Sequence, residues 1–382
     1  MGTLNRGALA RLRSVLQSHI DQGRIPGAVA VVALGGHVEV FDALGRRDPA
    51  TGAAMQDDAI FRIYSMTKPL VSLAALMLAE EGRLPLGDAV AKYLPEFGSA
   101  QVGVEEGGKL RLQPLQRPPT VHDLLRHTAG LTYEFLGASA VQSRYAEADI
   151  ASRSRTNAEF SKVLAALPLA HQPGSCWHYS RATDVLGALL EVVSGQTLAA
   201  LLQERVLGPL RMKDTAFSVP QAHWQRLAEP FGTDPDSGEP VAMLDPREAP
   251  AFESGGGGLM STAGDYVRFL QFMRNGGALE GVRLVSRKTI EWMTSDHLGR
   301  IAPDGDLLLP GYGFGLGFAV RTHAGLAPQP GSPGQYFWSG IGGTSFFVDP
   351  AEDVFGMLLT QAPNQRILFR NMFRHLVYAA ID

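Results

Sequence analysis

The sequence predicts an α+β fold in which one antiparallel sheet is assembled from both ends of the chain. Two strand patterns lie near the N-terminus, in residues 27–42, and three lie near the C-terminus, in residues 311–360. Between them the pattern is mainly helical, with long polar connections. We therefore expect a sheet domain of residues 1–82 and 246–382, flanked by helices, and an inserted, mainly helical domain of residues 83–245.

The first segments predict a helix followed by a hairpin. Leucines recur at helical spacing in residues 5–22, which is typical of an amphipathic helix. Residues 27–34 are continuously apolar and residues 37–42 alternate between apolar and polar, with Gly35-Gly36 between the two runs. A two-residue glycine turn in this position predicts a β-hairpin.

A second helix is predicted to begin at Ser65. The serine oxygen would cap the first turn, and Pro69 lies in that turn, where a missing N–H costs least. Apolar residues then recur at i, i+3, i+4 and i+7, which predicts one buried face, and Glu80-Glu81-Gly82 ends the pattern. Because positions i and i+3 share one face of a helix, we expect Ser65 and Lys68 to touch.

Further helices are predicted for the middle of the chain, and strands with a last helix for its end. The helical segments are residues 121–131, 157–167, 181–194 and 197–207, followed by a loop at residues 234–250 and a helix that opens at Ser261. The strands are residues 311–321, 336–348 and 354–360, and a helix over residues 364–380 closes the chain.

The composition is that of an ordinary globular protein. Apolar residues make up 45% and charged residues 19%, and the formal net charge is −4 without a basic run, so we expect neither a nucleic-acid partner nor a membrane partner. No spanning segment and no signal-peptide core appear, and a cytoplasmic location is expected. Cys176 is the only cysteine, which excludes an intramolecular disulfide and a cysteine-based zinc site. We expect no cofactor and no metal, and the oligomeric state stays open.

Three motifs carry the candidate chemistry. Ser65-x-x-Lys68 puts a hydroxyl at a helix start beside an amine, and a partly desolvated lysine of lowered pKa can activate a serine nucleophile. Tyr179 lies in Trp-His-Tyr-Ser-Arg, just before a predicted helix. Trp338-Ser339-Gly340 lies within a strand pattern, where a glycine permits close approach by a ligand.

Together these motifs resemble the serine β-lactamase superfamily. Ser-x-x-Lys, a later tyrosine and a Trp-x-Gly followed by Phe-Phe-Val-Asp-Pro occur in that family's order over nearly the whole chain. The chain is similar to class C β-lactamases, and more closely to family VIII carboxylesterases. This resemblance implies the β-lactamase/penicillin-binding-protein-like fold, with the active site between the sheet domain and the helical domain.

The resemblance also implies the roles of the site residues. Ser65 would be the acylated nucleophile, with Lys68 and Tyr179 as a linked general base and acid, and which of the two takes the serine proton stays open. The backbone N–H groups of Ser65 and Ile341 would form the oxyanion hole. The residues expected to line the substrate pocket are Trp338, Gly340 and Tyr133.

Two positions depart from the class C pattern and bear on the substrate. Class C enzymes carry an asparagine where this chain has Arg181, which we expect to be a surface charge at a helix start. They carry Lys-Thr-Gly where this chain has Trp338-Ser339-Gly340. A tryptophan cannot hold a carboxylate, but it offers an apolar wall and one N–H donor. The departures favour a serine carboxylesterase that hydrolyses small to medium carboxylic esters through an acyl-enzyme, and they leave weak β-lactam hydrolysis open.

Other functions are compatible with the same residues. The scaffold also suits an acyltransferase, a β-lactamase or D-amino-acid peptidase, or an inert scaffold protein. A Ser-His-Asp hydrolase is disfavoured because Gly-x-Ser-x-Gly is absent. We therefore expect His127 and His178 to be structural or to support neighbouring residues.

Overall fold

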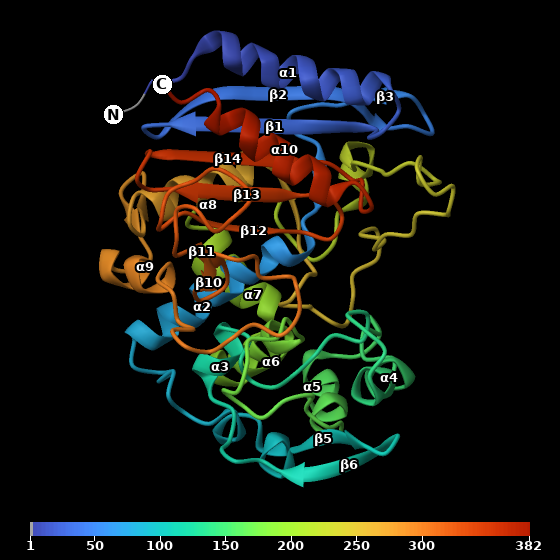
Figure 1. Ribbon diagram of the computed structural model, residues 1–382, viewed down its shortest axis with the longest axis vertical. Coiled ribbons are helices and arrows are strands. Elements are labelled where there is room, and N and C mark those ends of the chain that lie inside the picture. Colours follow the sequence, from blue (N-terminus) through green and yellow to red (C-terminus); the bar gives the residue numbers. More distant parts are fainter. Residues whose placement is uncertain (1–2) are drawn as a thin grey trace.

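The computed structural model describes residues 3–382, and its largest element is an eight-stranded antiparallel sheet (Figure 1). The strand order is β10-β11-β12-β13-β14-β1-β2-β3. The strands of the sheet are β1 (Gly27–Leu34), β2 (His37–Asp48), β3 (Ala53–Ala54), β10 (Tyr312–Phe314), β11 (Ala319–Arg321), β12 (Tyr336–Ser339), β13 (Ser345–Asp349) and β14 (Val354–Leu359). The pairing of β14 with β1 places the two ends of the chain in one sheet, as predicted.

The predicted hairpin at Gly35-Gly36 is confirmed. Leu34 of β1 pairs with His37 of β2. Both glycines have positive φ, 59° and 81°, which is the backbone conformation that a two-residue type I′ turn needs. Strand β2 is longer than its alternating pattern indicated and continues to Asp48.

Two of the three strands predicted near the C-terminus are in fact hairpins. Residues 311–321 form β10 and β11, and residues 336–348 form β12 and most of β13, each pair antiparallel. Glycines with positive φ reverse the chain inside each run, Gly317 at 108° and Gly343 at 115°. The apolar pattern continues across both turns because both sides of each turn are buried.

Helices cover both faces of this sheet. Phe346 of β13 packs on Tyr266 of α8 (Ala263–Arg274), whereas the next residue, Phe347, packs on Phe373 of α10 (Arg366–Tyr378). Successive strand residues point to opposite faces, so α8 and α10 lie on opposite sides. Helix α1 (Arg6–Asp21) lies beside α10 and β2 (Figure 1).

Residues 83–194 are mainly helical and lie beyond β10 and α2 (Figure 1). The remaining helices are α2 (Thr67–Glu80), α3 (Val121–Leu125), α4 (Ala140–Glu147), α5 (Asn157–Ala165), α6 (Ala182–Ser194), α7 (Leu198–Leu202) and α9 (Arg287–Met293). The remaining strands are three two-stranded pairs: β4 (Ile60–Arg62) with β7 (Met260–Thr262), β5 (Gln101–Glu106) with β6 (Lys109–Pro114), and β8 (Ala278–Leu279) with β9 (Val282–Arg283).

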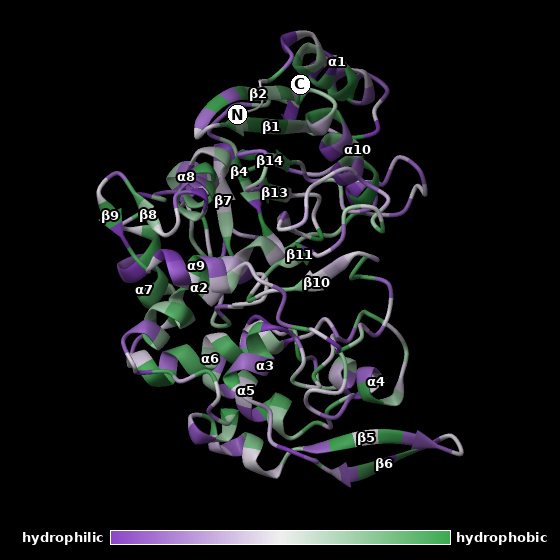
Figure 2. Ribbon diagram, turned by 60° about the vertical axis from the view of Figure 1, so that its left-hand side comes forward, coloured by the Kyte–Doolittle hydropathy of each residue, from purple (hydrophilic) through white to green (hydrophobic). Residues whose placement is uncertain are grey.

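Helix α4 and the β5–β6 hairpin were not predicted, and the hairpin forms the end of the molecule farthest from α1 (Figure 2). Its turn is Gly107-Gly108, both with positive φ. The predicted boundaries at residues 82/83 and 245/246 stay predictions.

Across residues 3–382 no single helix has both the length and the apolar character that crossing a membrane requires. Two consecutive segments, Ala182–Ser194 and Leu198–Leu207, are long and apolar enough only when taken as one span, and the chain bends by 79° between them.

Candidate active site

Ser65 lies in a single 3-10 turn, Tyr64–Met66, directly before α2. The prediction that Ser65 caps this helix is wrong, because Met66 holds the cap position and no side chain caps the helix. Tyr64 has a φ of +43°, a conformation that is costly for a bulky residue and is found mostly at functional sites. Its hydroxyl accepts a hydrogen bond from the Leu244 N–H at 2.9 Å, which helps to hold the turn.

Helix α2 is buried on every side from Thr67 to Leu78, not on one face as its periodicity predicted. It packs against α6 and α7, and its Ser72 lies against Gly317 of the β10–β11 turn. Because α2 runs through the interior, the amine of Lys68 is also fully buried.

The predicted contact between Ser65 and Lys68 is present, and Tyr179 joins it. The Lys68 Nζ lies 3.2 Å from the Ser65 Oγ, and the Tyr179 hydroxyl donates to the same oxygen at 2.6 Å. Lys68 Nζ also lies 4.5 Å from the centre of the Tyr179 ring. The three side chains therefore form one cluster around the Ser65 oxygen, which is itself only partly buried.

Burial gives Lys68 an unusual protonation equilibrium. Removal of its ammonium from water lowers the pKa of Lys68 to about 7, with Asp184 opposing the shift and Arg181 supporting it. Near neutral pH a large share of the molecules thus carries a neutral amine beside the serine. Burial also raises the pKa of Tyr179, which keeps the phenol protonated and able to donate.

Tyr133, which we expected to line the substrate pocket, contacts Lys68 directly. It is buried, and its hydroxyl accepts a hydrogen bond from Lys68 Nζ at 3.0 Å. Its ring packs on that of Tyr179, with centroids 5.2 Å apart. A second acceptor, the Gly256 carbonyl, lies 2.6 Å from the same nitrogen. Tyr133 and Gly256 therefore hold the amine in place.

Arg181 is not the surface charge that we expected. Its side chain is buried and pairs with Glu134 and Asp184. Its guanidinium carbon lies 4.8 Å from the centre of the Tyr133 ring. These two carboxylates balance the positive charge of Arg181, so the side chain can be buried and need not extend into solvent.

Asp184 links this ion-pair cluster to Lys68. It accepts hydrogen bonds from the Ser254 hydroxyl at 2.5 Å and from the Gly256 N–H at 2.9 Å. The Gly256 carbonyl in turn binds Lys68. Sequence spacing gave no signal for this chain of contacts, since Asp184 and Gly256 are far apart in the chain.

The turn between β12 and β13 packs directly on the segment that precedes Ser65. A Cβ on Gly340 would lie 2.5 Å from the Ile63 carbonyl oxygen, so only glycine fits there. The close approach at Gly340 is thus made by the protein's own backbone, whereas the sequence pattern suggested a ligand.

The two predicted oxyanion donors are unengaged. Among the hydrogen bonds of residues 3–382, the backbone N–H groups of Ser65 and Ile341 have no acceptor. Ile341 follows Gly340 and is 42% exposed. Both groups are therefore available to a bound oxygen, and their role stays a prediction.

Trp338 borders the cluster from β12. Its indole is 7% exposed, packs on the Tyr179 ring at 5.2 Å between centroids, and directs its N–H at the Tyr179 hydroxyl over 3.4 Å. Next to it, Arg370 of α10 donates to the Ser339 hydroxyl at 2.8 Å. Sequence reasoning missed this arginine, so the strand without a lysine still has a cation beside it.

The two histidines considered in the sequence support neighbouring residues. His127 is buried against the Tyr179 ring, with centroids 4.9 Å apart, and its Nδ1 lies 3.2 Å from the Ser180 hydroxyl. His178 hydrogen-bonds through Nε2 with the Thr132 hydroxyl at 2.9 Å. Neither has a hydrogen bond to Ser65 among the described contacts.

Comparison with known proteins identifies the family. Residues 12–379 match the Beta-lactamase family model. The chain belongs to the beta-lactamase family. Esterase EstB of Burkholderia gladioli is 36% identical to this chain over 375 residues, which cover 92% of this chain and 90% of EstB. A lovastatin esterase of Penicillium rubens is 30% identical over 299 residues, which cover 75% of this chain and 72% of the esterase.

A similar solved structure supports the same placement. EstCE1, described as a hydrolase with promiscuous acyltransferase activity, matches with a TM-score of 0.81 at 30% identity, over 97% of this chain and 98% of its own. The chain is thus a member of the serine β-lactamase superfamily of hydrolases and is similar to family VIII esterases. The predicted family and fold class are confirmed, and the roles of individual residues stay predictions.

Proposed function

We propose that this protein is a serine carboxylesterase that cleaves small to medium carboxylic esters through an acyl-enzyme on Ser65. The observation that carries the proposal is the fully buried amine of Lys68 at 3.2 Å from the Ser65 oxygen. Burial lowers the pKa of this amine to about 7. A base poised near the working pH is what general-base catalysis requires. The esterase relatives support ester substrates.

The first half of the reaction forms the acyl-enzyme. The neutral amine of Lys68 takes the Ser65 proton as the serine oxygen attacks the ester carbonyl. The N–H groups of Ser65 and Ile341 donate to the oxyanion, and one such donor contributes about 3 kcal/mol. The Tyr179 phenol gives its proton to the departing alkoxide, and the Lys68 ammonium returns one to Tyr179. An alcohol leaves and the ester of Ser65 remains.

The second half releases the acid. Water loses a proton to Lys68 as its oxygen attacks the acyl carbon, and the tetrahedral intermediate uses the same two donors. Collapse breaks the bond to the Ser65 oxygen, which regains a proton from Tyr179, and the Lys68 ammonium restores the phenol. The raised pKa of Tyr179 suits it to donate and not to remain a phenolate. We assign the base to Lys68 for this reason.

The surfaces around Ser65 favour an uncharged acyl or alcohol group. Trp338, Tyr179 and Tyr133 present aromatic rings to the cluster. Arg370 beside Ser339 offers a cation at the edge of the strand, so a substrate with a distant carboxylate is not repelled. We therefore expect neutral esters to be better substrates than β-lactams.

The test is a panel of p-nitrophenyl esters of graded acyl length, assayed beside a chromogenic cephalosporin. We expect ester turnover to exceed cephalosporin turnover. A Ser65→Ala variant should lose activity by about 10³-fold or more, and an active-site phosphonate should add one label, on Ser65. Wild-type activity in Ser65→Ala, or labelling elsewhere, would refute the mechanism. Faster turnover of the cephalosporin than of any ester would make the protein a β-lactamase.

Acyl transfer is a second candidate, favoured by the described acyltransferase activity of EstCE1. An alcohol in place of water would take the acyl group from Ser65 by the same proton path. Adding benzyl alcohol to a vinyl ester reaction and measuring benzyl ester separates the two. A benzyl ester yield above that of free acid in aqueous buffer would make transfer the principal reaction.

A further inference from the structure

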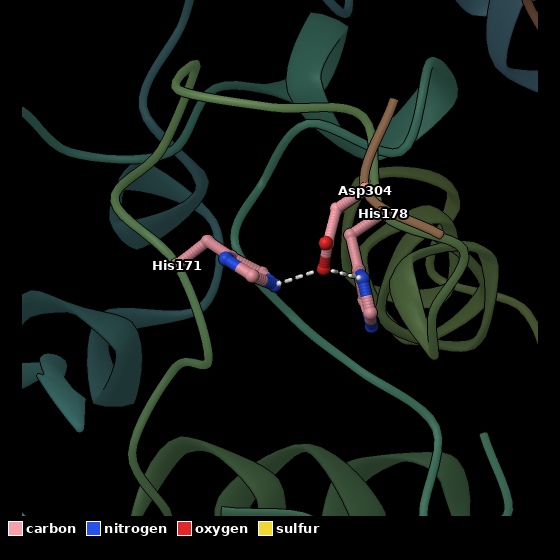
Figure 3. Close-up of side chains that lie close together, drawn as sticks. All are labelled: His171, His178 and Asp304. Carbon is pink, nitrogen blue, oxygen red and sulfur yellow. Dashed lines mark hydrogen bonds and ion pairs between the residues drawn. The ribbon is translucent and has the colours of Figure 1, made fainter. Parts of the chain in front are cut away.

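Two histidines and one aspartate converge on one another (Figure 3), at a cavity that Tyr179 also lines. His171 and His178 precede α6, and Asp304 lies in the segment that connects α9 to β10. The His178 Nδ1 lies 2.9 Å from the Asp304 carboxylate, and the His171 Nε2 lies 3.2 Å from the same oxygen. One potential ligand atom from each residue lies within 4.8 Å of the other two.

These atoms have the spacing and chemistry of a zinc site. Zinc binds imidazole nitrogen and carboxylate oxygen at about 2.0–2.2 Å in a tetrahedron, which sets its ligands about 3.3 Å apart. Both contacts to Asp304 are already near that separation. The Asp304 side chain is 52% exposed, so its oxygen has room to move when a cation enters. Three protein ligands leave a fourth position open.

The surroundings orient the ligands in advance. The Thr132 hydroxyl binds Nε2 of His178, which leaves Nδ1 facing Asp304. An outer partner of this kind is typical of metal-binding histidines. The backbone also holds the two segments together, because the Trp177 N–H donates to the Ala302 carbonyl and the Asp304 N–H donates to the Trp177 carbonyl, at 2.9 and 2.8 Å.

The three side chains border a cavity of about 560 Å³ that is also lined by Tyr179. The cavity gives an ion a route to the ligands. A bound ion would lie close to the catalytic cluster, because its ligand His178 is the residue directly before Tyr179.

We propose that His171, His178 and Asp304 bind one divalent transition cation of the zinc class. The ion links the segment that carries Tyr179 to the segment that carries Asp304, and it stabilises both against local opening. Calcium does not fit, since it requires six or more oxygen ligands. No metal-ligand spacing appears in the sequence because Asp304 is remote from the two histidines in the chain.

The test measures zinc binding by the full-length protein after removal of metal with a chelator. Titration with ZnCl₂ should show one equivalent bound per chain, and addition of CaCl₂ should show none. Asp304→Asn and His171→Asn should each weaken zinc binding at least tenfold. His37→Asn, which removes an exposed histidine outside the cluster, is the matched control and should bind like the wild type.

Thermal unfolding gives an independent readout. Zinc should raise the Tm of the wild type and of His37→Asn above their values in chelator, but it should leave the Tm of Asp304→Asn at its own value in chelator. No zinc binding by the wild type at 100-fold molar excess would overturn the proposal and leave an ordinary carboxylate–imidazole cluster. Binding that survives Asp304→Asn but is lost in His297→Asn would overturn it too, and would place the ion at the His122–His297 pair, whose ring nitrogens lie 2.9 Å apart.

Discussion

Ser65 lies between two regions of opposite character. On one side Lys68 and Tyr133 are buried in a network of charges and hydrogen bonds that includes Arg181. On the other side the β12–β13 turn carries the exposed Ile341, whose backbone N–H is unengaged, as is that of Ser65. Proton transfer needs fixed partners and little water, whereas substrate binding needs an open surface. We infer that the buried side sets the reaction and the open side sets the substrate.

The largest effect should come from removing the buried amine. Lys68→Met fills the same volume without a base, so kcat/KM for p-nitrophenyl butyrate should fall by about 10³–10⁴-fold. Lys109→Met, on the exposed β5–β6 hairpin, is the control and should keep wild-type activity. A loss below tenfold for Lys68→Met would mean that Tyr179 alone supplies the base and that the buried side does not set the reaction.

A fixed contact on the open side should matter next. In Gly340→Ala the new methyl group would meet the Ile63 carbonyl, which must shift the turn that carries Ile341. Moving the Ile341 N–H out of position in this way should lower kcat about 10²-fold. Gly325→Ala adds a methyl group with nothing near it and should be neutral. Comparable kcat values for both variants would show that the turn plays no part in the chemistry.

Selectivity should respond to Trp338. Trp338→Lys places a cation where the class C pattern has one, so the ratio of cephalosporin turnover to ester turnover should rise about tenfold. Trp338→Phe keeps an apolar wall and should leave that ratio near its wild-type value. An equal loss of both activities in Trp338→Lys would indicate that this residue supports Tyr179 and does not select the substrate.

The smallest effect should be a shift of the pH profile. Activity needs the neutral amine, so kcat/KM should rise with pH through about 7, the pKa of Lys68. Arg181 lowers that pKa, and Arg181→Gln also leaves Glu134 and Asp184 without their cation. The rising limb should therefore move to higher pH. Arg181→Lys keeps the charge and should move it less. If the rising limb of the pH profile does not move in Arg181→Gln, the ion-pair cluster does not influence the pKa of Lys68.

Local patterns predicted the parts of the site that depend on short-range geometry. Ser65 and Lys68 touch because they are three positions apart on a helical backbone, even though the helix begins later than its serine suggested. The hairpin at Gly35-Gly36 followed from its turn chemistry. Tyr179 was found through the family resemblance, since nothing in its own segment distinguishes it from a structural tyrosine.

Contacts between distant segments were beyond the reach of such patterns. Arg181 looked exposed because its partner Glu134 comes from another loop. The strands of residues 311–321 and 336–348 looked continuous because apolar residues flank buried turns as well as strands. The contact of Tyr133 with Lys68 and that of Arg370 with Ser339 depend on the assembled fold alone.

The close packing of Gly340 on Ile63 has a consequence for how such a site can evolve. Any side chain at position 340 would displace the backbone at Ile63, just before Ser65, so only glycine is tolerated there. Ile341 beside it is 42% exposed and carries no such restriction. We therefore expect new substrate preferences to arise through substitutions at position 341, which leave the contacts among Ser65, Lys68 and Tyr179 unchanged.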